Sequence, residues 1–477
     1  RRVTTPGDGR NTYIPRMEWA DADTLMLQHM NRLQNVTNVL LARPSDGAVT
    51  RVFEDRSSAW LDAVDDEDVE WLSGGAEFTW VSEKDGWRHV YAIARDGSRE
   101  RLLTRFDGDA MGINAIDTRG GRLYFTASPA NATERYLYMS RLDGDGSVTR
   151  VTPASLPGTH AYDISPDGRW AIHTWSEFEV PPSVELVSLP DHRTVRTLVD
   201  NSELARRMAS TLQPAAEFVS VDIGGGIGLD GWVIRPRDFD PSKRYPLIVH
   251  VYGEPASTTV NNRWGGSTML FHRAIADQGF VVVSFDNRGT PAPKGASWRH
   301  VVYGTVGDLS SKDQAAAVQA FAASRPWVDA SRVGVWGWSG GGSNTLNCLF
   351  RFPGLFDVGV SVAPVPDQRL YDTIYQERYM GVPQGNAEGY RIGSPINFAE
   401  GLEGDLLVIH GSGDDNVHAQ GAERLVNRLV ELGKRFEFMV YPNRTHAIAE
   451  GPGTTVDVRK RIARFLVERM AALPADR

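Results

Sequence analysis

The chain has 477 residues, a formal net charge of −9 and 41% hydrophobic residues. This length and this globular composition predict two to four domains and exclude a mainly disordered or coiled-coil protein. The net acidity argues against a nucleic-acid partner. The sequence contains no run of about 18 apolar residues, so no membrane span is expected. Its single cysteine, Cys348, excludes a disulfide within the chain.

Residues 1–200 contain a repeated hairpin pattern, in which an alternating strand, a turn with Asp or Gly and a second strand follow one another. Its four copies read VTNVLLARPSDGAVTRV, WRHVYAIARDGSRERLL, ERYLYMSRLDGDGSVTRV and PPSVELVSLPDHRTVRTL. The period is marked by arginines 46 to 50 residues apart, namely Arg2, Arg51, Arg101, Arg150 and Arg196. A period of about 40–50 residues with several short strands predicts a β-propeller. The alternative, a β-sandwich with coincidental spacing, is disfavoured because the turns recur in phase.

The phase of the repeat bears on how the chain begins. The opening RRVTT matches the end of a repeat unit, and four full units follow it. We therefore expect about four blades in an N-terminally truncated chain; the alternative is an N-terminal strand that completes the last blade. An open arc would expose apolar faces and strand edges, so we expect the chain to associate, and a homodimer is one possible form.

The compartment depends on the N-terminus. We expect a periplasmic or secreted protein if a missing N-terminus carries a signal peptide, and a cytoplasmic protein otherwise.

From about residue 213 the pattern changes to apolar runs that alternate with helical segments. The runs cover 245–253, 279–286, 332–339, 357–365, 405–413 and 436–443. Val and Ile are frequent in them, which is typical of strands buried on both faces of a parallel sheet. Helices are expected over 311–324, 418–433 and 454–470, and an antiparallel hairpin within 215–240. The sequence thus predicts a propeller segment over 1–212 and an α/β domain with a mostly parallel, doubly wound sheet over 213–477.

The strongest chemical motif follows the third of these runs. Gly337-Trp338-Ser339-Gly340-Gly341 matches G-x-S-x-G between a predicted strand and a helix, which is the context of the nucleophile elbow of an α/β hydrolase. Glycines are needed because the turn is too tight for bulky neighbours. Ser339 is therefore the candidate nucleophile, and the backbone N–H of Gly340 is expected to face the developing oxyanion.

A serine nucleophile needs a base, and in this fold an acid and then a histidine follow the serine along the chain. Asp414 and Asp415 follow the run 405–413, and His446 follows the last run. Both carboxylates are candidates for orienting the imidazole. Asp415 has an alternative role as the cap of a helix that begins near His418. We expect no metal, because these residues and His410 lack the helical spacing of metal ligands.

Together with APVPDQRLYDTIYQERYMG (363–381), HGSGDDNVH (410–418) and SEKDGWRHVYAI (82–93), these motifs resemble the prolyl oligopeptidase family of serine peptidases, and within it the dipeptidyl peptidase IV branch. The resemblance implies a β-propeller joined to an α/β hydrolase domain. It also implies a triad with Ser339 as nucleophile, Asp414 as acid and His446 as base. The Tyr252 hydroxyl would join the Gly340 N–H in the oxyanion hole. No cofactor is implied.

The resemblance also implies a substrate pocket. Its proline-binding walls would be Trp338, Val365, Tyr371, Tyr375 and Val417. Asn416 would bind the carbonyl that precedes the P1 residue, and Arg378 would support the site of the substrate amine. The alternative for the two tyrosines is core packing, because a spacing of four places them on one face of a helix.

Three features depart from the family pattern. Gly340 stands where this branch usually has Tyr, and Gln368 where the proline pocket often has Trp, which predicts a more polar wall. The paired glutamates that clamp a substrate's free amine in this branch have no counterpart, because the sequence contains no Glu-Glu dipeptide. The acidic run 65–68 is expected to be a solvated loop instead.

The predicted activity is hydrolysis after Pro or Ala, with release of N-terminal dipeptides through an acyl-enzyme. The substrates would be peptides with Pro or Ala at the penultimate position. A tripeptidyl peptidase, an acylaminoacyl peptidase and a carboxylesterase of the same fold are the enzymatic alternatives. An inactive propeller-based binding protein is the alternative from another class.

Overall fold

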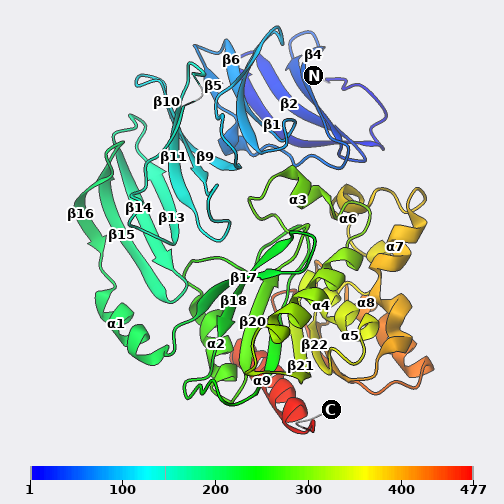
Figure 1. The fold of residues 1–477 in the computed structure, drawn as a ribbon. Coiled ribbons are helices and arrows are strands. Elements are labelled where there is room, and N and C mark those ends of the chain that lie inside the picture. Colours follow the sequence, from blue (N-terminus) through cyan, green and yellow to red (C-terminus); the bar gives the residue numbers. More distant parts are fainter. Residues whose placement is uncertain (1–2, 146, 475–477) are drawn as a thin grey trace. The chain divides into compact units, whose positions relative to one another are not determined.

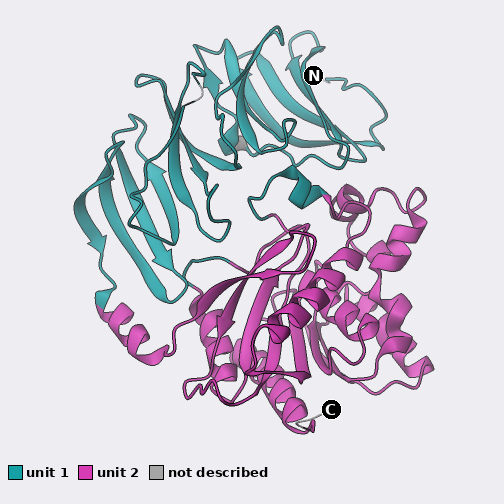
Figure 2. Cartoon of the chain, in the orientation of Figure 1, with its two compact units in different colours: residues 1–202, 261–264, 292–300 teal, residues 203–260, 265–291, 301–477 magenta. Residues whose placement is uncertain are grey.

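The computed structural model describes residues 3–145 and 147–474, and Figure 1 shows how their helices and strands are arranged. The chain forms two compact units, coloured separately in Figure 2. The first unit extends to Ser202 and also includes the short segments 261–264 and 292–300. The second unit comprises 203–260, 265–291 and 301–477. The expected domain division at 212/213 stays a prediction.

The first unit contains four antiparallel sheets of four strands each, in which every strand pairs with the next in sequence. The first sheet comprises β1 (Thr12–Asp21), β2 (Thr24–Asn31), β3 (Val36–Arg43) and β4 (Ala48–Arg56). The second comprises β5 (Trp71–Leu72), β6 (Glu77–Ser82), β7 (His89–Ala94) and β8 (Glu100–Leu102). The third comprises β9 (Ala110–Asp117), β10 (Arg122–Ala127), β11 (Tyr136–Arg141) and β12 (Val148–Arg150). The fourth comprises β13 (Thr159–Ile164), β14 (Trp170–Glu177), β15 (Val180–Ser188) and β16 (Arg193–Val199).

These sheets confirm the predicted propeller segment of about four blades. Each predicted hairpin forms the third and fourth strands of a blade, and four of the marker arginines lie on fourth strands: Arg51, Arg101, Arg150 and Arg196. The remaining marker, Arg2, and Arg1 lie outside the described residues, so the match of the opening RRVTT to the end of a blade stays a prediction. The pattern succeeded because each hairpin must place alternate side chains on a buried face.

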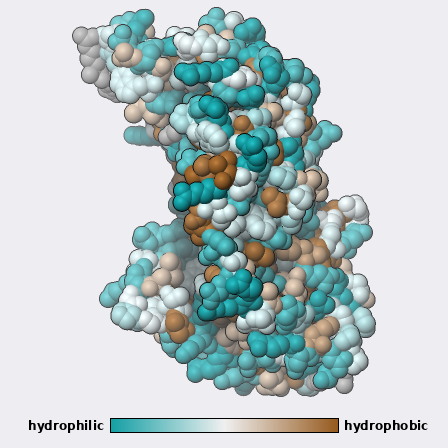
Figure 3. Space-filling view, turned by 90° about the vertical axis from the view of Figure 1, so that its left-hand side faces the viewer, coloured by the Kyte–Doolittle hydropathy of each residue, from teal (hydrophilic) through white to brown (hydrophobic). Residues whose placement is uncertain are grey.

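Neighbouring blades bury apolar side chains against each other. Phe78 and Trp80 of the second blade pack with Met26 and Val39 of the first. Two strands of the outer blades are more exposed. On β1 of the first blade the Trp19 side chain is 61% exposed, and on β16 of the fourth blade every residue is exposed. Figure 3, which views the side of the molecule that carries β16, shows apolar side chains scattered among hydrophilic ones.

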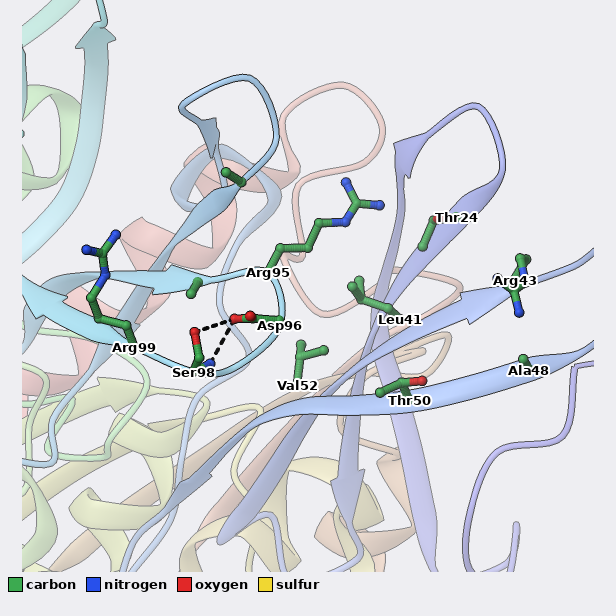
Figure 4. A pocket seen from close by; sticks show the side chains of 12 residues that line it. Thr24, Leu41, Arg43, Ala48, Thr50, Val52, Arg95, Asp96, Ser98 and Arg99 are labelled. Atoms are coloured by element: carbon green, nitrogen blue, oxygen red, sulfur yellow. Dashed lines mark hydrogen bonds between the residues drawn. The ribbon is translucent and has the colours of Figure 1, made fainter.

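A groove of about 930 Å³ lies between the first and second blades (Figure 4). Three arginines line it, but each has an acidic partner within the first unit. Arg43 pairs with Asp46 at 2.7 Å, Arg99 pairs with Glu77 at 2.9 Å, and Arg95 pairs with Asp21. Because carboxylates already neutralise the three arginines, we do not interpret the groove as an anion-binding site.

The acidic run 65–68 is not simply a solvated loop, so that prediction is wrong in part. Residues Asp66–Asp68 form the 3₁₀ helix η1, and the Asp68 carboxylate accepts the backbone N–H of Ile113 at 2.6 Å. Burial raises the pKa of Asp68. Asp65 is exposed and pairs with Arg16 at 2.7 Å, whereas the Asp66 side chain lies outside what the structure describes.

The second unit is built on an eight-stranded sheet with the order β17-β18-β20-β19-β21-β22-β23-β24. Its strands are β17 (Glu217–Asp222), β18 (Gly228–Ile234), β19 (Tyr245–His250), β20 (Val281–Asp286), β21 (Val328–Trp338), β22 (Val358–Val362), β23 (Asp405–Gly411) and β24 (Glu437–Tyr441). The hairpin β17–β18 is antiparallel, β18 is antiparallel to β20, and all later pairs are parallel. The predicted α/β hydrolase sheet is therefore confirmed.

The helices are α1 (Ser202–Thr211), α2 (Gly266–Ala276), α3 (Ala296–His300), α4 (Asp308–Ala323), α5 (Gly340–Arg351), α6 (Thr373–Met380), α7 (Ala387–Gly393), α8 (Ala419–Glu431) and α9 (Thr454–Ala471). The 3₁₀ helices η2 (Gln368–Leu370) and η3 (Pro395–Gly401) flank α6 and α7.

Two glycines show which helices cover the sheet. Gly334 on β21 approaches α9, whereas Gly359 on the neighbouring strand β22 faces the opposite side of the sheet and approaches α5. The two helices thus cover opposite faces of the sheet. Within the described residues, no helix has the length and apolarity needed to cross a membrane.

Candidate active site

The turn between β21 and α5 has the geometry of a nucleophile elbow. Ser339 has a φ of 61°, in the left-handed region that non-glycine residues rarely adopt. A Cβ on Gly341 would lie 2.1 Å from the carbonyl oxygen of Val251, so only glycine fits there. The Ser339 N–H donates to the carbonyl of Val362 at 2.8 Å, which ties the strained turn to β22. The half-buried serine is therefore held at the strand end by its backbone.

Asp414 and His446 form the clearest side-chain pair of the site. The His446 Nδ1 atom lies 2.8 Å from Asp414 Oδ2, and the Asp414 side chain is fully buried. The other carboxylate oxygen accepts the backbone N–H groups of Asn416 and Val417, at 3.0 and 2.9 Å. Asp415 is exposed. Of the two candidate acids, only Asp414 contacts the imidazole.

The electrostatics of Asp414 follow from its surroundings. Burial alone would raise its pKa, but hydrogen bonds from His410 and His446 and from the Val417 N–H outweigh burial and hold the pKa well below its usual range. The Asp414 carboxylate is consequently charged at every pH at which the protein would work. It can orient the ring of His446 and stabilise its protonated form.

The loop that bears His446 is fixed to the elbow. The Trp338 indole N–H donates to the carbonyl oxygen of His446 at 2.9 Å. A hydrogen bond between the Ser339 hydroxyl and His446 is not present among the described residues. Such bonds are often long in a free enzyme and shorten when substrate binds.

The predicted oxyanion donors come from two elements that one side chain joins. Asn344 Nδ2 on α5 donates to the carbonyl oxygens of Tyr252 and Gly340, at 2.8 and 3.1 Å. Tyr252 follows β19, so its loop is held beside the elbow. Burial raises the pKa of Tyr252, and the nearby charge of Glu254 adds to this. The hydroxyl therefore keeps its proton and can donate it to an oxyanion.

The predicted pocket residues lie in one aromatic corner. The rings of Tyr371 and Tyr375 meet edge to face, with centroids 5.1 Å apart. The Tyr371 hydroxyl donates to Asn416 Oδ1 at 2.7 Å, and the Tyr375 hydroxyl donates to Glu254 Oε2 at 3.1 Å. The prediction that the two tyrosines share a helical face is wrong, because Tyr371 precedes α6 and only Tyr375 lies on it. The N-cap at Asp372 starts a new helix between them.

The other predicted site residues take more ordinary positions. Val365 and Val417 are buried, and Val365 donates its N–H to Ser343 Oγ on α5 at 2.9 Å. The Arg378 guanidinium on α6 lies 5.8 Å from the centroid of the Tyr379 ring. Gln368 is buried, and its side-chain amide points to the backbone carbonyl of Gly393 at 3.4 Å.

The alternatives for the acidic loop are not supported. His418 occupies the N-cap of α8 without a side-chain capping bond, so Asp415 does not cap this helix. The structure, over the ranges it describes, contains no group of three or more His, Cys, Asp or Glu residues that could hold a metal ion.

Two functional candidates were missed in the sequence. Glu254 lies in the segment HVYGEP (250–255) with Tyr252 and was assigned no role, although its carboxyl contacts Tyr375. His410 is fully buried with its Nε2 atom 3.2 Å from Asp414 Oδ2 and 2.8 Å from the Val417 carbonyl. The signal for Glu254 was a charged residue two positions after the predicted oxyanion tyrosine.

Comparison with known proteins agrees with this geometry. The model of the prolyl oligopeptidase family matches residues 267–472, and that of the dipeptidyl peptidase IV N-terminal region matches residues 1–182. The crystal structure of Porphyromonas gingivalis dipeptidyl peptidase 4 has 33% sequence identity and a TM-score of 0.91, and the match covers 98% of this chain and 65% of that one.

Curated relatives lead to the same family. A probable dipeptidyl-aminopeptidase B of Emericella nidulans is 31% identical over 98% of this chain and 52% of its own length. A dipeptidyl peptidase 4 of Trichophyton equinum is 30% identical over 88% of this chain and 55% of its own length. The chain therefore spans little more than half the length of these relatives. With a nucleophile elbow, an Asp–His pair and both family regions present, the chain belongs to the prolyl oligopeptidase family of serine peptidases, in its dipeptidyl peptidase IV branch.

Proposed function

We propose that the protein is a serine peptidase that releases N-terminal dipeptides by cleaving after Pro or Ala. The observation that carries the proposal is the Asp414–His446 pair beside the elbow of Ser339, with an aromatic corner in the same unit. The names of the relatives as dipeptidyl peptidases support the dipeptide product.

The mechanism follows from the positions of these groups. Ser339 Oγ attacks the carbonyl carbon of the P1 residue, and His446 Nε2 takes the hydroxyl proton. The Tyr252 hydroxyl and the Gly340 N–H stabilise the oxyanion, each donor supplying about 3–4 kcal/mol. His446 then gives its proton to the leaving amine, and water hydrolyses the acyl-enzyme by the reverse sequence.

The aromatic corner accounts for the proposed preference at P1. The edge-to-face rings of Tyr371 and Tyr375 offer flat apolar surfaces that suit a pyrrolidine ring. The bond from Tyr371 to Asn416 holds the Asn416 amide nitrogen in a fixed orientation, in which it can donate to the preceding substrate carbonyl.

The test uses decapeptides with Pro, Ala, Leu or Phe as second residue, each with a free or an acetylated N-terminus. Mass spectrometry should find dipeptides from the free Pro and Ala peptides, and Ser339→Ala should release none. Tripeptide products would replace this proposal with a tripeptidyl activity. Equal kcat/KM for Pro and Phe peptides would contradict the proline pocket and favour an esterase-like or acylaminoacyl enzyme.

A further inference from the structure

Glu254 is a carboxyl group built into the wall of the elbow. It is 5% exposed and follows Tyr252 by two residues. A Cβ on Gly340 would lie only 2.7 Å from Glu254 Cδ and 2.8 Å from its Oε2. Glu254 therefore occupies the space beside residue 340, and the tyrosine that the family pattern leads one to expect at 340 would collide with it. Glycine at 340 thus leaves room for the glutamate at 254 in the position that it occupies.

The carboxyl has little to stabilise a negative charge. Its Oε2 accepts the Tyr375 hydroxyl at 3.1 Å, while Oε1 is buried and has no hydrogen-bond partner within the described residues. The titratable groups that face it are tyrosines: Tyr375 from α6, Tyr371 from the segment before α6, and Tyr252 from its own loop. Tyr379 on α6 in turn faces Tyr375 and Tyr252. On the side of α5 it lies against Gly340.

A buried carboxyl in such surroundings favours its neutral form. Burial raises the pKa of Glu254 to about 7, even though the hydrogen bond from Tyr375 lowers it. The proton is therefore gained and lost within the range in which peptidases work. Once ionised, the group places a negative charge beside Gly340 and close to Tyr252, the two residues that would supply the oxyanion donors. Like charges in a site of low dielectric oppose each other strongly.

We propose that Glu254 makes hydrolysis at Ser339 dependent on pH. Its neutral carboxyl permits an oxyanion to form beside Tyr252 and Gly340, and its ionised carboxyl opposes it. The inference rests on the serine-hydrolase part of the proposed function, with Tyr252 and Gly340 as oxyanion donors. It does not depend on the substrate's N-terminus or on the proline pocket. An ordinary serine hydrolase rises with pH to a plateau as its histidine loses a proton. This enzyme should pass through a maximum and then lose activity.

The test measures the second-order rate at which a small alkyl fluorophosphonate labels Ser339 between pH 5 and 10, together with kcat/KM for Gly-Pro-p-nitroanilide. The wild-type rate should fall about tenfold per pH unit above the midpoint, since one proton must be retained. Glu254→Gln is neutral at every pH and still accepts the Tyr375 hydroxyl, so its rate should stay on a plateau. Glu377→Gln removes another buried glutamate, on α6, and should keep the decline.

Each result has a defined meaning. A decline that persists unchanged in Glu254→Gln overturns the inference, as does a wild-type plateau up to pH 10. Thermal melts at pH 7 and pH 9 establish that every variant compared is folded. If labelling shows the decline but Gly-Pro-p-nitroanilide is not cleaved, the dipeptide proposal fails while the role of Glu254 stands. If the fluorophosphonate does not label Ser339 at all, both fail.

Discussion

Replacing Asp414 by asparagine tests how the acid of the site acts. One oxygen of Asp414 accepts two backbone N–H groups, from Asn416 and Val417, so this position must remain an oxygen. The asparagine NH₂ must then take the place of Oδ2, 2.8 Å from His446 Nδ1. Two donors cannot face each other, so Nδ1 becomes the acceptor and the ring proton moves to Nε2. A protonated Nε2 cannot accept the Ser339 proton.

The expected loss in kcat is about 10⁴-fold, the size known for a triad acid replaced by its amide, which equals roughly 5 kcal/mol of transition-state stabilisation. The variant should remain folded, because its shape and backbone bonds are kept. The matched control is Asp415→Asn, an exposed neighbour, for which kcat should change by less than about threefold and stability by less than about 0.5 kcal/mol.

The assay is steady-state hydrolysis of p-nitrophenyl acetate and of Gly-Pro-p-nitroanilide, with circular dichroism as the check of folding. A folded Asp414→Asn protein with kcat within tenfold of the wild type would refute the tautomer argument. A larger loss for Asp415→Asn than for Asp414→Asn would show that the wrong acid has been assigned.

Three further predictions concern stability. Within the first unit Arg299 forms buried ion pairs with Asp109, at 2.7 and 2.9 Å, and with Glu83, at 2.7 Å. Arg299→Met takes this partner from both carboxylates and should cost about 3–5 kcal/mol in chemical denaturation. Adding Asp109→Asn removes one of the two charges and should reduce the loss, and equal losses would contradict the argument. Burial lowers the pKa of His160 to about 4 and that of His173 to about 3, because the folded protein favours their neutral rings. Their contribution to the free energy of unfolding is therefore complete above pH 6.5 and is lost as the pH falls through these two pKa values. Their double replacement by Gln should flatten the acid loss of stability, which for His160 alone is on the order of 3 kcal/mol, and an unchanged pH dependence of melting would disprove it. Gly341→Ala should destabilise the protein by at least about 2 kcal/mol, because its methyl group would collide with the Val251 carbonyl, and an unaltered melting temperature would contradict the elbow geometry.

The overall fold could be predicted because its signals are periodic. The marker arginines recur once per blade, since Arg51 and Arg101 occupy equivalent fourth strands. The parallel strands stand out as Val- and Ile-rich runs bounded by turns. The elbow is also local, because a left-handed serine between glycines can be recognised from five residues.

The remaining features depend on contacts between distant segments. Nothing in the run 65–68 indicates that Asp68 accepts an N–H from residue 113. Segment 292–300 lies among hydrolase elements in sequence but belongs to the first unit, where Arg299 pairs with Asp109 and Glu83. The choice between Asp414 and Asp415 depends on which side chain turns inward. Glu254 gains its meaning only from Gly340, which is 86 residues away in the sequence.

The most direct test of the central claim is the covalent trapping of the nucleophile by a substrate-like probe. Gly-Pro diphenyl phosphonate should form a single adduct, which tandem mass spectrometry should locate on Ser339. The adduct should be absent in Ser339→Ala and form at least about 10³-fold more slowly in His446→Ala. An adduct on another residue, or one that forms equally fast in Ser339→Ala, would contradict the assignment of Ser339 as the nucleophile of a proline-directed peptidase.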